Sequence, residues 1–173
     1  LHYGTRHITA VEIDEQRVEV MKTVLKDYSN NLYGDPRVNV VIQSGRGFLR
    51  GTREKFDLIV IQRPWTSQVT NSYLYQTSDE LFTEEAFAAY LDAIEEDGVI
   101  YLGVPYADFA AQTRYLLPSI KSQFPHIKNK VLLFHRVYHG DEKDLLAVLI
   151  GNEADLLRFY SSYKDDYTFL FSP

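Results

Sequence analysis

Continuous apolar runs that alternate with helix-like segments constrain the fold of this chain more than any other feature. Within each run β-branched residues dominate and few polar residues interrupt, which is typical of strands buried on both faces of a parallel sheet. The runs cover residues 8–13, 38–43, 56–61 and 98–104. We therefore predict a doubly wound α/β fold, with these four strands parallel in one mostly parallel sheet.

The C-terminal part of the chain carries a different pattern. Residues 131–138 and 145–150 read as two strands that only the segment "HGDEKD" connects. A parallel pair needs a crossover of about a dozen residues or more, so these two strands must be antiparallel if they pair. We expect this hairpin at one edge of the sheet. Helical spacing of apolar residues predicts the remaining elements, which are helices at 14–28, 83–94, 107–123 and 153–163 and a helical turn near 47–50.

Composition limits the class of protein. A length of 173 residues suits a single domain, 1–173, and an apolar content of 45% is enough for a core. The net charge of −6 argues against a nucleic-acid partner, and no apolar run is long enough to span a membrane. The chain has no cysteine, which fits a reducing compartment such as the cytoplasm. The histidines are not in metal-binding spacing with a carboxylate, so we expect no metal site.

An acidic pair, Glu12 and Asp14, follows the first apolar run and precedes a helical pattern. Asp14 is placed as the N-cap of that helix. Glu12 has two readings: it is a simple strand end, or it is the acid that binds ribose hydroxyls at the end of the second strand of a nucleoside-binding sheet. A glycine-rich loop should then lie about 20 residues earlier, before Leu1. We therefore expect the first strand and helix, with that loop, to be missing from this chain.

Four stretches together resemble the spermidine synthase family, within the class I S-adenosylmethionine-dependent methyltransferase fold. They are "ITAVEID", "YGDPRVNVVIQSGRGFL", "FDLIVI" and "LFTEEAFAAYLDAIEEDGVIYL", so the resemblance spans about residues 7–104. It implies a cofactor, S-adenosylmethionine or decarboxylated S-adenosylmethionine, bound at the carboxyl ends of the strands. The C-terminal hairpin matches the last two strands of that fold.

The resemblance also implies roles for individual residues. Glu12 matches the ribose-binding acid, and Ser44 and Gly45 match the Asp–Gly or Asp–Ala pair that holds the adenine. Gln62 matches the aspartate that takes a proton from the attacking amine in aminopropyl transfer. A glutamine amide cannot act as a general base near neutral pH, so true spermidine synthesis is not expected.

Two function classes follow, with a third ranked below them. The chain is part of a transferase with a small-molecule amine or another acceptor, or it is a non-catalytic relative that keeps the fold for binding or assembly. The third is a nucleotide-binding oxidoreductase. The long polar segment after Gln62 contains Trp65, Tyr73 and Tyr75, which either line a pocket or pack against the sheet.

The expected loss of the first strand has two consequences. Without the glycine loop, the chain alone should bind S-adenosylmethionine or methylthioadenosine weakly or not at all. Residues 8–13 and 56–61 would also lose the strand between them, and unpaired apolar edges are templates for further pairing. We expect these two strands to pair directly with each other, and a second copy of the chain to associate with the remaining apolar surface as a homodimer.

Overall fold

The computed structural model describes residues 4–62, 81, 83–105, 131–136, 145–163 and 168–171. The chain divides into two compact units, residues 1–52 and 53–173, which are described separately below. The single domain of residues 1–173 stays a prediction. The expected helix at 107–123 and the residues Trp65, Tyr73 and Tyr75 lie outside the described residues.

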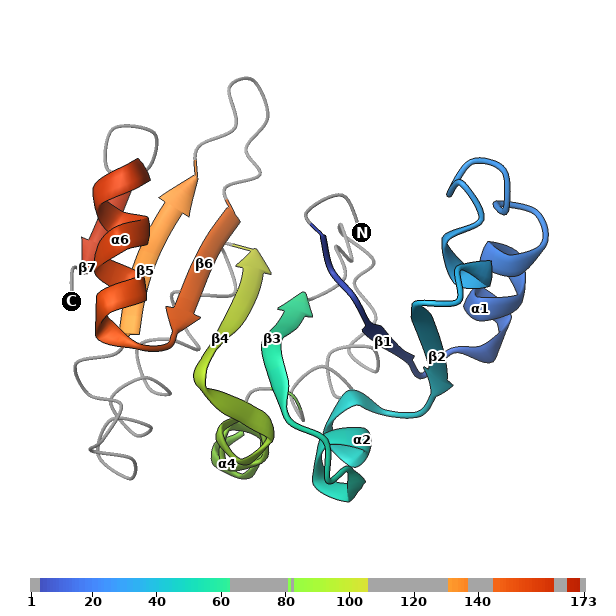
Figure 1. Cartoon of the computed structure of the whole chain (residues 1–173), viewed down its shortest axis with the longest axis horizontal. Coiled ribbons are helices and arrows are strands. Elements are labelled where there is room, and N and C mark those ends of the chain that lie inside the picture. Colours follow the sequence, from blue (N-terminus) through green and yellow to red (C-terminus); the bar gives the residue numbers. More distant parts are fainter. Residues whose placement is uncertain are drawn as a thin grey trace. The chain divides into compact units, whose positions relative to one another are not determined.

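The first unit is a parallel pair of strands with its helices (Figure 1). Its elements are β1 (Ile8–Glu12), α1 (Glu15–Lys22), the 3-10 turn η1 (Leu32–Gly34), β2 (Val38–Ile42) and α2 (Gly45–Gly51). The strands pair in register from Ile8 opposite Val38 to Glu12 opposite Ile42. The carboxyl ends of both strands therefore lie on the same side of the sheet, and the segments that follow the two strands begin there.

Helix α1 is shorter than the expected helix at 14–28, because it ends at Lys22 and the chain continues in turns. The Thr23 hydroxyl donates to the carbonyl oxygen of Glu19 at 2.7 Å, a local bond that competes with helix propagation. Asn30 and Asn31 both have left-handed backbone with φ of 52°. The extension would also bury little, since Tyr28 is 90% exposed.

The second unit is a five-stranded sheet with helices α4 and α6 (Figure 1). Its elements are β3 (Phe56–Gln62), α4 (Glu84–Ala93), β4 (Ile94–Pro105), β5 (Val131–Arg136), β6 (Leu145–Ile150), α6 (Glu153–Tyr163) and β7 (Thr168–Phe171). The strand order is β3-β4-β6-β5-β7. The β3–β4 pair is parallel, and the other neighbouring pairs are antiparallel. This arrangement confirms the α/β class, the parallel pairs and the C-terminal antiparallel hairpin.

The predicted position of the hairpin at the sheet edge is wrong, since β7 adds to β5 on its outer side. Among the described strands, β1 pairs with β2 in the first unit, and β3 pairs with β4 in the second. Both β1 and β3 are the first strand of their sheet's order, with a described partner strand on one side. One sheet of all four parallel strands, and direct pairing of 8–13 with 56–61, stay predictions.

The core of the second unit lies where helix α4 and strand β4 contribute fully buried side chains. Tyr90 and Phe87 of α4 are 0% and 1% exposed, with ring centroids 5.5 Å apart. On the sheet, Ile100 and Leu102 of β4 are 1% and 2% exposed. Gly98 of β4 fits a tight place, because a Cβ there would lie 2.9 Å from the carbonyl oxygen of Phe56.

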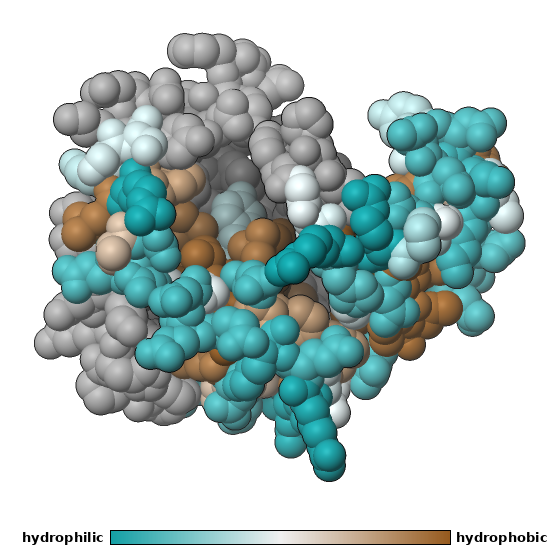
Figure 2. Space-filling view, viewed as in Figure 1, coloured by the Kyte–Doolittle hydropathy of each residue, from teal (hydrophilic) through white to brown (hydrophobic). Residues whose placement is uncertain are grey.

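Apolar surface remains open to solvent in both units. Figure 2 shows it as brown areas between the teal, hydrophilic ones. On β3 the alternation is clear: Ile59 and Ile61 are buried, whereas Leu58 and Val60 are 56% and 55% exposed. One face of β3 thus belongs to the core and the other does not.

Candidate functional site

The structure places Glu12 at the carboxyl end of β1 and fixes its carboxylate from one side. The backbone N–H of Asp14 donates to Oε1 of Glu12 at 3.0 Å. Oε2 lies 3.6 Å from Nη1 of Arg17, which is an ion pair but too long for a hydrogen bond. The side chain of Glu12 is 26% exposed, so the carboxylate is reachable from solvent. One oxygen is therefore anchored, while the other keeps its acceptor capacity.

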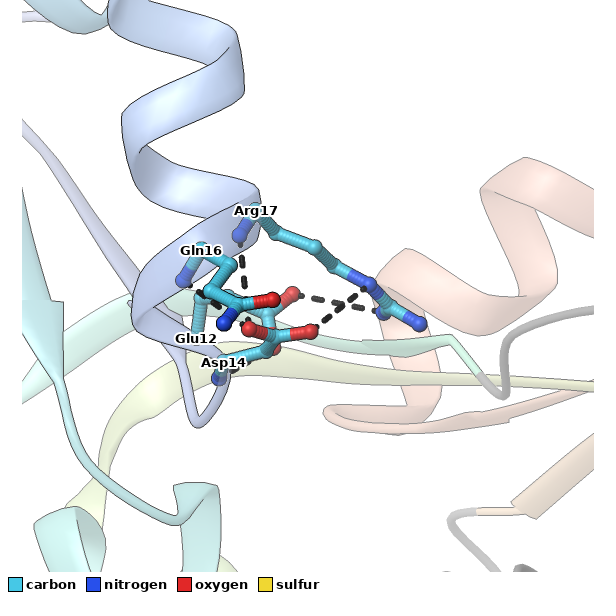
Figure 3. Close-up of polar contacts among 4 residues, drawn as sticks. All are labelled: Glu12, Asp14, Gln16 and Arg17. Carbon is cyan, nitrogen blue, oxygen red and sulfur yellow. Dashed lines mark hydrogen bonds and ion pairs between the residues drawn. The ribbon is translucent and has the colours of Figure 1, made fainter.

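Asp14 is the N-cap of α1, as predicted. Its Oδ1 accepts from the backbone N–H groups of Gln16 at 2.9 Å and Arg17 at 3.4 Å, and Figure 3 shows these contacts. Its Oδ2 lies 3.6 Å from Nε of Arg17. The two carboxylates of the acidic pair thus differ in role. Asp14 accepts hydrogen bonds from free N–H groups in the first turn of α1, whereas Glu12 lies at the end of β1, partly exposed to solvent.

Ser44 and Gly45 follow β2 and lie at the same edge as Glu12. The backbone N–H of Gln43 donates to the carbonyl oxygen of Glu12 at 3.0 Å, which continues the β1–β2 pairing to this edge. Ser44 is the N-cap of α2, and its Oγ accepts from the backbone N–H of Gly47 at 3.1 Å. A Cβ at Gly47 would lie only 2.8 Å from that Oγ, so the close approach depends on glycine. The structure therefore brings together three predicted site residues.

Gln62 is the last residue of β3, in the second unit, where it lies opposite Gly103 of β4 in the parallel register. The predicted position at the carboxyl end of a strand is thereby confirmed for its backbone. Its catalytic role stays a prediction, as do the pocket-lining roles of Trp65, Tyr73 and Tyr75. The described part of the chain contains no cluster of metal-binding side chains and no helix suited to cross a membrane.

Sequence reasoning missed an ion pair between Asp35 and Arg37 in the turn before β2. Oδ1 of Asp35 accepts from the backbone N–H and from Nε of Arg37, each at 2.9 Å, and Oδ2 accepts from Nη2 at 2.7 Å. The side-chain hydrogen bond from Arg37 is the main cause that lowers the pKa of Asp35 to about 2. The carbonyl oxygen of Arg37 accepts from the N–H of Ile8 at 2.8 Å, so this turn begins the β1–β2 register. The Asp-x-Arg spacing was the available signal.

The chain is similar in sequence to polyamine aminopropyltransferases and in fold to solved structures of spermidine synthase and methylases. A polyamine aminopropyltransferase of Pectobacterium carotovorum is 35% identical over 98 residues, which are 57% of this chain and 31% of the relative. The crystal structure of spermidine synthase from Thermotoga maritima matches with a TM-score of 0.60 and 21% identity, covering 89% of this chain and 50% of that one. An rRNA methylase from Streptococcus thermophilus shares the fold with a TM-score of 0.53, 12% identity and coverage of 84% and 73%.

The chain thus spans about a third of the first relative and half of the spermidine synthase structure. The model of the spermine/spermidine synthase domain matches residues 1–132, which is most of the 173 residues. The chain belongs to the spermine/spermidine synthase domain family.

Proposed function

We propose that this chain contributes nucleoside-binding residues to a transferase that uses decarboxylated S-adenosylmethionine or S-adenosylmethionine, with a small-molecule amine or another small acceptor. The observation that carries the proposal is the carboxylate of Glu12, anchored through Oε1 by Asp14 and open at Oε2. A vicinal ribose diol offers two O–H donors, and an ionised carboxylate accepts both. Ser44 and Gly45 at the same edge then take the base.

Local charge favours a ribose without phosphate. The described ion pairs at the proposed ribose position join two anions, Glu12 and Asp14, to one cation, Arg17. Their sum is negative, so a phosphate on the ribose would meet net repulsion. This supports a ligand with two free ribose hydroxyls, such as an adenosyl thioether or sulfonium, over one that carries a phosphate on the ribose.

In our proposal the chain does not carry out spermidine synthesis itself, because Gln62 stands at the position of the family's catalytic aspartate. An amide is neither a base nor an acid near neutral pH, so Gln62 cannot take a proton from the acceptor's amino group as its nitrogen attacks. The acceptor must then arrive already deprotonated, or another group must take the proton. The second candidate function, a non-catalytic relative that binds the nucleoside without transfer, rests on the same residue.

The test of binding is a calorimetric titration of the complete natural protein with methylthioadenosine. The variant Glu12→Gln removes the charged acceptor and should weaken binding by about 1.5–3 kcal/mol, the usual range for hydrogen bonds to charged groups. Glu15→Gln is the matched control, because it removes the same charge from the first turn of α1. Equal affinity of Glu12→Gln and wild type would overturn the proposal.

The test of catalysis is the variant Gln62→Asp, assayed for transfer from decarboxylated S-adenosylmethionine to a diamine. A positioned general base contributes about 10²- to 10⁴-fold, so restoring the carboxylate should raise the rate by a measurable part of that factor. A protein that binds the nucleoside but transfers nothing in either form would favour the non-catalytic candidate.

A further inference from the structure

Arg17 stands between the two carboxylates of the acidic pair without a tight bond to either. Its Nη1 is 3.6 Å from Oε2 of Glu12, and its Nε is 3.6 Å from Oδ2 of Asp14. Figure 3 shows the guanidinium reaching from the first turn of α1 toward both groups. A hydrogen bond between such groups would be about 2.7–2.9 Å long. These contacts are therefore attractions between charges that leave the lone pairs of Oε2 open.

We propose that Arg17 is a positioning residue for Glu12, which holds that carboxylate ready for a ribose diol; the inference rests on the proposed function. The carboxylates of Glu12 and Asp14 lie two residues apart and repel each other, and the repulsion acts against the hydrogen bond that anchors Glu12. The guanidinium offsets this repulsion. Because it contacts Oε2 only through charge, both hydroxyls of the diol still find acceptors on the anchored carboxylate.

The position of Arg17 follows from the junction between β1 and α1. Asp14 caps the helix and accepts from the backbone N–H of Arg17, so the helix start fixes where the side chain leaves the backbone. The side chain of Arg17 is 60% exposed, whereas that of Glu12 is 26% exposed. The guanidinium of Arg17 is thus more exposed to water than the carboxylate of Glu12, which lets it stay hydrated beside the pair.

The size of the effect is modest because the ion pair is exposed. Exposed pairs contribute about 0–1 kcal/mol, which corresponds to at most a fivefold change in an equilibrium constant. The loss of Arg17 should therefore reduce binding of a diol-bearing ligand by about two- to fivefold. A purely structural role in α1 would instead lower the affinity for every nucleoside equally.

The experiment compares methylthioadenosine with its 2′-deoxy analogue by calorimetry on the complete natural protein. The dissociation constant of the 2′-deoxy analogue divided by that of methylthioadenosine measures how strongly the protein recognises the diol. Arg17→Gln should lower this ratio by about two- to fivefold, and Arg17→Lys, which keeps the charge, should restore most of it. Lys22→Gln, at the last turn of the same helix, is the matched control and should leave the ratio unchanged. Circular dichroism of each variant verifies that α1 and its unit are folded.

A ratio that is unchanged or larger in Arg17→Gln, with a wild-type protein that prefers the diol, would overturn this inference alone. Equal affinity of the wild type for both ligands would overturn the proposed function and the inference with it. In the double variant with Glu12→Gln, the substitution Arg17→Gln should have no further effect on the ratio, and a further decrease would contradict positioning through Glu12.

Discussion

Ser44 is the N-cap of α2 and, in our proposal, a residue that contacts the base, so its substitutions should give two distinct results. Its Oγ caps α2 through one hydrogen bond of 3.1 Å to the N–H of Gly47. Loss of an N-cap costs about 0.5–2 kcal/mol. Helix α2 has only seven residues, "GRGFLRG", and glycine lowers helix stability by about 1 kcal/mol per residue relative to alanine. The helix therefore depends strongly on its cap, and Ser44→Ala should cost about 1–2 kcal/mol.

Ser44→Asp should behave differently, because aspartate is about as good an N-cap as serine. Its stability should lie within about 0.5 kcal/mol of the wild type, while its carboxylate offers the 6-amino group of adenine a charged acceptor. Urea unfolding followed by circular dichroism measures the first effect, and calorimetry with methylthioadenosine measures the second. Thr83→Ala is the matched cap control, since Oγ1 of Thr83 accepts from Ala86 in the other unit.

Either of two results would contradict these roles of Ser44. A loss below about 0.3 kcal/mol for Ser44→Ala would show that the 3.1 Å bond does not hold the helix start. Weaker ligand binding by a folded Ser44→Asp protein would contradict the place of the base next to this residue.

Three further predictions concern stability and assembly. The pKa of Asp35, about 2, lies below its ordinary value of 3.8, so its stabilising contribution is complete above pH 3.8 and is lost as the pH falls toward 2. Acid titration of unfolding should therefore show a smaller loss over this range for Asp35→Asn than for the wild type; equal losses would contradict the pairing. Tyr90→Phe removes the 2.6 Å bond to the carbonyl oxygen of Leu81 and should cost about 1–2 kcal/mol in urea unfolding, and no loss would refute that role. Lysine at Leu58 or Val60 should weaken the homodimer that we propose for this chain, and sedimentation that finds a wild-type monomer at high micromolar concentration would refute the dimer.

Local signals in the sequence predicted where Glu12, Asp14 and Ser44 lie in the first unit, at strand ends and helix caps. Asp14 is a cap because its carboxylate satisfies N–H groups only two and three residues away, which spacing alone reveals. Glu12 ends β1 and Ser44 follows the end of β2 by two residues, and neighbouring parallel strands place their carboxyl ends on one side of the sheet. These positions follow from short-range geometry, so a single sequence was enough.

The errors arise where burial or pairing with distant residues decides. The apolar residues Val24 and Leu25 suggested a helix to 28, but Val24 is 78% exposed and no core rewards the extension. The tail that forms β7 has too few residues for a clear pattern, and its partner β5 decides its conformation.

The most direct test of the central claim is a crystal structure of the complete natural protein with methylthioadenosine bound. We predict that both ribose hydroxyls lie about 2.5–3.0 Å from the carboxylate oxygens of Glu12, with Oε1 still accepting from the N–H of Asp14. The adenine should then lie beside Ser44 and Gly45. A ribose bound elsewhere, with the Glu12 carboxylate unoccupied by the ligand, would contradict it.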